Sequence, residues 1–186
     1  MAFIYTGIGS RAAKELPEVM TKLEAVGTTM ANLGCILRSG GADGADLAFE
    51  NGHRNVTEEN LEIYLPWKGF NKEVRPSNHN DHWELCEYAK DMAISIHPKW
   101  EALSHGGRKL HTRNIYQMLG KTLDKPSNML LCWTVDGKIA GGSRTAIYVA
   151  LNNNVPVINL NDEEWSRFTT EEFLAIISRY VTTFKE

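Results

Sequence analysis

The densest group of residues with binding chemistry is the stretch at residues 39–46, which reads SGGADGAD. Glycines and a serine ahead of a helix let several backbone N–H groups point at one anion, so Ser39, Gly40 and Gly41 predict a phosphate cradle. It is not a Walker A loop, because no G-K-[ST] follows it. Asp43 and Asp46 fit the cap and first turn of that helix, and Asp46 equally fits a contact to a sugar hydroxyl or a base. We count both aspartates among the candidate ligand contacts.

A second glycine-rich stretch, AGGSRTA, lies at residues 140–146 ahead of another predicted helix. Gly141 and Gly142 let the backbone come close to a ligand, and Ser143 and Thr145 are placed to donate to phosphate oxygens. One such helix start can arise as a simple turn. Two of them at one sheet edge predict a ligand of nucleotide size.

The first strand is followed by GIGSR at residues 7–11. Gly9 permits close backbone approach, Ser10 offers a hydroxyl, and Arg11 can form a fork onto a phosphate or carboxylate. The same residues also fit a tight strand-to-helix turn with a solvated arginine. We include them in the predicted ligand site.

Further candidates follow other predicted strands or precede a helix. The segment RKLHTRN at residues 108–114 is a local basic patch, in which Arg113 and Asn114 are the predicted ligand contacts. Thr134 and Asp136 lie in the turn after a strongly apolar strand, where Asp136 can take ribose hydroxyls. Trp67 either stacks on a base or covers the edge of the core.

Catalysis and metal binding have weaker support in the sequence. Glu50 lies four residues after Asp46, so both share a helix face and form a candidate acid/base pair or a solvated pair. His79 and His82 are three residues apart, but no further ligand completes a metal set, so we predict neither a metal nor a cofactor. No nucleophile elbow G-x-S-x-G is present.

Composition places these residues in an ordinary globular chain. The 186 residues carry a formal net charge of −3 and are 42% hydrophobic, which predicts one α/β domain and argues against a disordered chain. No apolar run reaches the ~18–20 residues of a membrane span, and the start shows no signal-peptide pattern. Three scattered cysteines are typical of reduced thiols, so we expect a cytoplasmic protein without membrane partners.

Alternating apolar runs, glycine turns and helical periodicity predict a doubly wound, mostly parallel sheet with helices on both faces, a Rossmann-like fold. In such sheets ligands bind at the carboxyl ends of the strands, which is where the candidates above lie. Gly52 is expected to end the short second helix, and loops are expected at 67–80 and 97–109. The predicted strands are 3–6, 35–37, 61–66, 129–134 and 155–160, and the predicted helices are 17–33, 47–49, 83–96, 113–119, 142–151 and 170–180.

Together these motifs resemble the SLOG superfamily, in particular its YpsA-related branch and the Rossmann-like domain of DNA-processing protein A (DprA/Smf). The resemblance runs from Gly7 to Leu160 and also includes WTxDG at residues 133–137 and VPVINL at residues 155–160. Small stand-alone members of this family are carried by bacteria and bacteriophages. The resemblance implies a nucleotide-type ligand without specifying one reaction.

Three kinds of function are implied by the resemblance. Phosphoribohydrolases of the family use P-G-G-x-G-T-x-x-E, whereas residues 140–148 here read AGGSRTAIY, with Arg144 for a glycine and Tyr148 for the glutamate. We therefore rank a sensor or sequestering protein for a nucleotide or ADP-ribose-like signal first. An N-glycosidic hydrolase ranks second, and a DprA-like binder of single-stranded DNA, disfavoured by the net charge, ranks third. A homo-oligomer is expected from the way many Rossmann-like domains pair.

Overall fold

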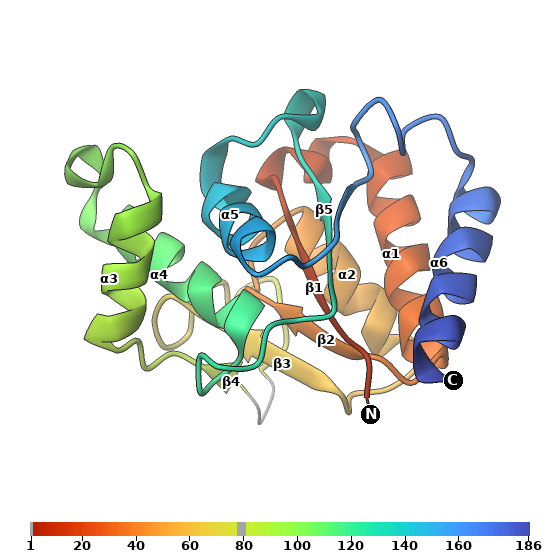
Figure 1. The fold of residues 1–186 in the computed structure, drawn as a ribbon, viewed down its shortest axis with the longest axis horizontal. Helices are drawn as coiled ribbons and strands as arrows, with labels where there is room; N and C mark the ends of the chain where they lie inside the picture. The colour runs from red at the N-terminus through yellow and green to blue at the C-terminus, as the bar shows by residue number, and fades with distance from the viewer. Residues whose placement is uncertain (1, 78–80) are drawn as a thin grey trace.

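A computed structural model describes residues 2–77 and 81–186 and shows one six-stranded sheet (Figure 1). The strand order is β4-β3-β2-β1-β5-β6, and every neighbouring pair is parallel. The predicted fold class, a Rossmann-like doubly wound α/β fold, is confirmed. The strands are β1 (Ile4–Gly9), β2 (Ile36–Ser39), β3 (Leu61–Tyr64), β4 (Asp81–His82), β5 (Met129–Trp133) and β6 (Val157–Asn159).

Helices cover both faces of the sheet, as parallel strands require. One face carries α1 (Pro17–Asn32), α2 (Ala45–Arg54) and α6 (Thr170–Lys185). The other face carries α3 (Glu87–Ile96), α4 (His105–Leu119) and α5 (Arg144–Asn152). Each layer encloses its own cluster of buried apolar side chains, so the sheet is held from both sides.

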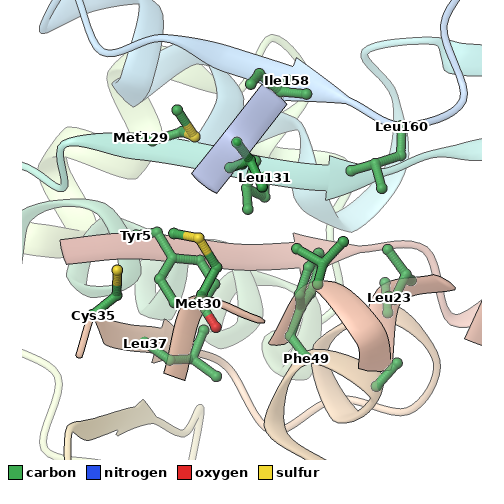
Figure 2. Packing of buried hydrophobic residues seen from close by; sticks show 14 of the residues in the cluster. Tyr5, Leu23, Met30, Cys35, Leu37, Phe49, Met129, Leu131, Ile158 and Leu160 are labelled. Atoms are coloured by element: carbon green, nitrogen blue, oxygen red, sulfur yellow. The ribbon is translucent and has the colours of Figure 1, made fainter. Parts of the chain in front are cut away.

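The larger core lies between the sheet and α1, α2 and α6. Figure 2 shows Tyr5 and Leu131 on adjacent strands, with Met30 of α1 and Phe49 of α2 packed over them. All five residues of β5 are buried, which matches the uninterrupted apolar run in its sequence. These contacts fix the strands whose carboxyl ends form the candidate site.

The centre of the sheet contains the switch in strand order. The chain moves outward from β1 through β2 and β3 to β4, then crosses back to place β5 on the other side of β1. In open α/β sheets this point opens a crevice at the carboxyl ends of the two central strands. Gly9 and Trp133 are paired there, and a Cβ at Gly9 would lie 2.3 Å from the Trp133 carbonyl oxygen.

Several predicted element boundaries were wrong. Helix α4 begins at His105, where a loop was predicted, because the Ser104 hydroxyl caps it by accepting from the Gly107 N–H at 3.1 Å. Helix α2 continues past Gly52, whose missing side chain lets α1 approach: a Cβ there would be 2.0 Å from the Glu24 carbonyl oxygen. Helix α3 starts at Glu87, four residues later than predicted.

The predicted loop at 67–80 is described only as far as residue 77, and the short strand β4 that follows was not predicted. Two of the three free cysteines, Cys35 and Cys132, are buried, while Cys86 is exposed. Over residues 2–77 and 81–186, no helix combines the length and the apolar character needed to cross a bilayer.

Candidate functional site

A cleft of about 380 Å³ opens at the carboxyl ends of β1 and β5, at the switch in strand order. The turn at residues 9–11 forms one wall, and the loop at residues 140–143 forms another. Ten of the predicted ligand-binding residues line it. They are Gly9, Ser10, Arg11, Asp46, Arg113, Asn114, Thr134, Gly141, Gly142 and Ser143.

The loop at residues 140–143, which we call the open loop, leads into α5 and faces this cleft. Gly141 has a φ of +65°, a conformation that favours glycine. A Cβ built at Gly141 or Gly142 would have no described atom within 4 Å, other than its own chain neighbours. Ser143 precedes α5 without a side-chain capping hydrogen bond, and the Arg144 N–H donates to the Gly141 carbonyl oxygen in a short 3₁₀ turn, so the exposed backbone of Gly141 and Gly142 is the part of this loop that a ligand can approach.

Asp46 and Arg113 form the floor of the cleft, and both side chains are almost fully buried. The Gly9 N–H donates to Asp46 Oδ1 at 3.1 Å, and Arg113 Nη1 lies 3.5 Å from Asp46 Oδ2. Burial raises the pKa of Asp46 to about 6, against the lowering effect of Arg113 and with a smaller raising effect from Glu50. The cleft therefore contains a carboxyl group that titrates close to neutral pH.

Asn114 connects the floor to the open loop. Its Nδ2 donates to the Gly142 carbonyl oxygen, which holds the loop against α4. Its Oδ1 is buried and has no hydrogen-bond partner among the described residues, and the same holds for Asp46 Oδ2. Asp46 Oδ2 keeps its ion pair with Arg113, so each of these two buried oxygens on the cleft floor can still accept a hydrogen bond from a donor such as a hydroxyl group.

Thr134 lines the cleft at the end of β5 and is held by β6. Asn159 Nδ2 donates to its Oγ1 at 2.6 Å, and Asn161 Nδ2 donates to its carbonyl oxygen at 2.9 Å. Ser10 is similarly engaged, because its hydroxyl accepts from the Ala12 N–H at 3.1 Å and caps a short 3₁₀ turn. These bonds hold the turn at residues 9–11 and the end of β5 in place.

The loop at residues 39–41, which we call the covered loop, does not line the cleft. Gly40 lies under Arg113, since a Cβ at Gly40 would be 1.3 Å from Arg113 Nη1. Gly41 lies under Leu65 and Arg75, with Leu65 Cδ2 only 2.8 Å from the Cβ position. The glycines of this loop therefore make room for side chains of the protein itself.

Glu50 lies behind the covered loop in a buried ionic network. Its Oε1 accepts from the Ser39 hydroxyl at 2.8 Å, and its Oε2 accepts from Arg75 Nε at 3.2 Å. Arg75 also donates to both carboxylate oxygens of Asp81, at 2.9 and 3.0 Å. Glu50 is not part of the cleft lining, so only Asp46 of the predicted acid/base pair faces the cleft.

Four other predicted contacts lie outside the cleft lining. Asp43 pairs with Lys14 at 3.5 Å, and Asp136 pairs with Lys138 at 3.1 Å, both in partly exposed positions. Thr145 Oγ1 is hydrogen-bonded to His111 Nδ1 at 2.7 Å. Burial lowers the pKa of His111 to about 4, and the charges of His97 and Arg113 add to this.

Trp67, the fourth, sits 5.0 Å from Phe70 between ring centroids, in an edge-to-face arrangement. Sequence reasoning missed Phe70 in the cleft lining because nothing in its neighbourhood marks it as more than a loop aromatic. Arg113 was predicted to begin a helix, whereas in the structure it lies in the middle of α4. The cleft residues that were not predicted are Ile8, Ala42, Phe70, Leu110, Val135, Lys138 and Ala140.

The described residues contain no group of three or more His, Cys, Asp or Glu side chains able to hold a metal ion; His79 lies outside them. Comparison of the chain with protein-family models, with curated proteins and with solved structures finds no match. Function must therefore be argued from the cleft.

Proposed function

We propose that this protein binds a nucleotide or a nucleotide-derived signal in the cleft between β1 and β5. The observation that carries the proposal is that the exposed glycine backbone at residues 141 and 142 lines the same cleft as Asp46 and Asn114, each of which has a buried oxygen without a hydrogen bond among the described residues. A glycine backbone beside the N-terminus of a helix favours a negatively charged ligand, and buried acceptors favour hydroxyl or amino donors. A phosphorylated sugar or nucleoside combines both.

Each part of such a ligand has a partner on the cleft wall. The exposed backbone of Gly142 meets the phosphate, and the exposed Arg11, also on the cleft lining, adds a positive charge. Asp46 Oδ2 and Asn114 Oδ1 accept from ribose hydroxyls. The cleft volume of about 380 Å³ falls within the range of small-molecule sites.

Calorimetric titration with nucleoside mono- and diphosphates and ADP-ribose tests the proposal. We expect at least one of them to bind with a Kd well below about 1 mM, which corresponds to more than roughly 4 kcal/mol of binding free energy. Gly142→Val fills the cleft without touching described protein atoms at its Cβ, so it is expected to abolish binding while leaving the unfolding midpoint unchanged.

Ala175→Val is a matched control for this variant. It adds bulk on the exposed side of α6, outside the cleft lining, and is expected to bind ligand like the wild type. Absence of binding across the whole nucleotide panel, or full binding by Gly142→Val, contradicts the proposal. Mass spectrometry of small molecules released by heat identifies a ligand that copurifies.

Hydrolysis of an N-glycosidic bond is a second candidate, favoured by Asp46. A carboxyl group with a pKa of about 6 on the floor of a cleft suits general acid–base catalysis near neutral pH. A single carboxylate can orient a water and stabilise an oxocarbenium-like centre, by analogy with glycoside hydrolysis. Glu50 is held by Ser39 and Arg75, so it supplies no second carboxylate in the cleft.

Chromatography of nucleoside monophosphates after incubation with the protein decides between binding and hydrolysis. Release of free base that disappears in Asp46→Asn and persists in Glu50→Gln supports hydrolysis. Intact substrate at protein concentrations that saturate the nucleotide removes the hydrolase and leaves the binding protein.

A further inference from the structure

A second hollow, of about 530 Å³, lies on the other side of the Trp67–Phe70 pair from the cleft. Trp67 and Trp83 border it with 38% and 37% of their surface exposed. Tryptophan is usually well buried, and two half-exposed indoles beside one hollow provide flat surfaces for a planar ring. We call this space, bordered by Trp67, Lys68, Trp83, His105, Arg108 and Lys109, the tryptophan hollow.

Positive charges outnumber negative ones on the lining of the tryptophan hollow, which also includes Glu87 and Lys90, paired with each other at 2.7 Å. Lys68 Nζ lies 5.5 Å from the centre of the Trp83 ring, and Lys109 stands on the first turns of α4. Within the described part of the chain, neither lysine forms an ion pair, whereas Arg108 is paired with Glu101 at 3.0 Å. Flat aromatic faces beside uncompensated cations match a nucleobase carried on a phosphate backbone.

The tryptophan hollow and the cleft are neighbours along two elements. Trp67 borders the hollow and Phe70 borders the cleft, with their ring centroids 5.0 Å apart. On α4, Lys109 borders the hollow and the next residue, Leu110, borders the cleft. A ligand that leaves the cleft past Phe70 therefore meets the indole of Trp67 directly.

We propose that the tryptophan hollow is a base-stacking subsite of the cleft, so that the ligand carries two nucleobases and is a dinucleotide rather than a mononucleotide. This inference rests on the proposed function, because the cleft holds the first nucleotide. The phosphodiester between the two nucleosides passes the ridge formed by Trp67 and Phe70. Lys68 and Lys109 face the outer half of the ligand.

Titration of adenosine monophosphate and of 5′-phosphorylated diadenylate tests this with three proteins. The wild type is expected to bind the dinucleotide at least ~10-fold more tightly than the mononucleotide, as stacking of one base on an aromatic side chain allows. Trp83→Leu is expected to remove this advantage and to leave mononucleotide affinity unchanged. Tyr88→Leu, an exposed aromatic on α3 outside both spaces, is the control and should retain the full advantage.

A lysine pair gives an independent check that does not depend on repacking an aromatic side chain. Lys68→Gln is expected to weaken the dinucleotide several-fold and to reduce its salt dependence, whereas Lys72→Gln, in the same loop beside Glu73, should change neither. Quenching of tryptophan fluorescence by the dinucleotide, reduced in Trp83→Leu, reports stacking directly.

The outcomes separate the two proposals. If the mononucleotide binds and is lost in Gly142→Val, but the dinucleotide has no advantage, the inference fails and the proposed function stands. If neither ligand binds the wild type, both fail. A dinucleotide advantage that persists in Trp83→Leu and in Lys68→Gln places the second base elsewhere and also overturns the inference.

Discussion

The covered loop at residues 39–41 and the open loop at residues 140–143 have similar sequences and opposite surroundings. Both contain two adjacent glycines after a parallel strand and before a helix. Gly40 is in contact with the Arg113 guanidinium, whereas the Cβ position of Gly142 meets no described atom within 4 Å. The same residue type therefore serves internal packing in one loop and leaves space for a ligand in the other.

The difference comes from the elements that pack over each loop. The covered loop lies beneath side chains from α4 and from the 67–77 segment, which bring Arg113 and Arg75 against it. Those cations meet Asp46 and Glu50 on α2, and the charges neutralise each other in the interior. The open loop has no such cover, and its glycines remain exposed.

Arg75→Ala is expected to have the largest effect on stability, because it removes the cation that packs over the covered loop. Glu50 and Asp81 would keep their buried charges without this partner, which costs about 3–5 kcal/mol of unfolding free energy. Urea unfolding followed by circular dichroism measures it. Lys72→Ala, in an exposed pair with Glu73, is the control and should lie within about 0.5 kcal/mol of the wild type. An equal effect of both variants would mean that the covered loop is not held by its ionic network.

The titration of Asp46 gives the second prediction. Its pKa is raised by burial from 3.8 to about 6 in the folded protein. The folded chain thus binds more protons than the unfolded chain between about pH 4 and 6, so stability falls as pH rises through this window. Asp46→Asn has no carboxyl group to titrate at this position. The difference between its free energy of unfolding and that of the wild type should therefore increase by about 2–3 kcal/mol between about pH 4 and 6, because one pKa unit corresponds to about 1.4 kcal/mol. Above about pH 6 the difference should stay constant.

Urea unfolding at a series of pH values measures this difference. Gly142→Ala, which changes no titratable group, is the control, and its difference from the wild type should be constant over the same range. A difference between Asp46→Asn and the wild type that is constant with pH would show that Asp46 keeps an ordinary carboxyl pKa.

The two loops also show which features of the structure can be predicted from the sequence. Apolar periodicity and glycine placement identified the layered fold and the strand ends, because each is a local property of the chain. The cover over Gly40 and Gly41 could not be predicted. It is made by Arg75 and Arg113, which lie 34 or more residues away, and a single sequence gives their charge but not their partners.

The predicted boundaries of two helices were wrong for a related reason. Gly52 was predicted to end a helix from its intrinsic preference, and residues 97–109, which contain Gly106 and Gly107, were predicted to be a loop. In the structure Gly52 lies where α1 and α2 are in close contact, and Gly107 supplies the N–H that the Ser104 hydroxyl caps. Tertiary packing and capping outweighed a local preference of about 1 kcal/mol in both cases.

Gly40→Ala compared with Gly142→Ala is the most direct test of the difference between the loops. At Gly40 the new methyl group must displace the buried Arg113 guanidinium from Asp46, which we expect to cost about 1–3 kcal/mol. At Gly142 the methyl group enters open space, so stability should change by no more than about 0.5 kcal/mol. Equal stabilities of the two variants by thermal and urea unfolding would contradict the covered arrangement.

Asn114→Ala is expected to have the smallest effect on stability and tests what holds the open loop. The side chain donates to the Gly142 carbonyl oxygen, and one such hydrogen bond contributes about 1 kcal/mol. Exchange of the Arg144 amide, whose N–H donates to the Gly141 carbonyl oxygen, should become faster in this variant, while exchange in the covered loop stays unchanged, because Gly40 and Gly41 are held by other side chains. Since Asn114 Oδ1 is also a proposed ligand contact, Asn114→Ala should weaken nucleotide binding more than it lowers stability. A loss of stability without a loss of binding would assign Asn114 to the loop alone and remove it from the site.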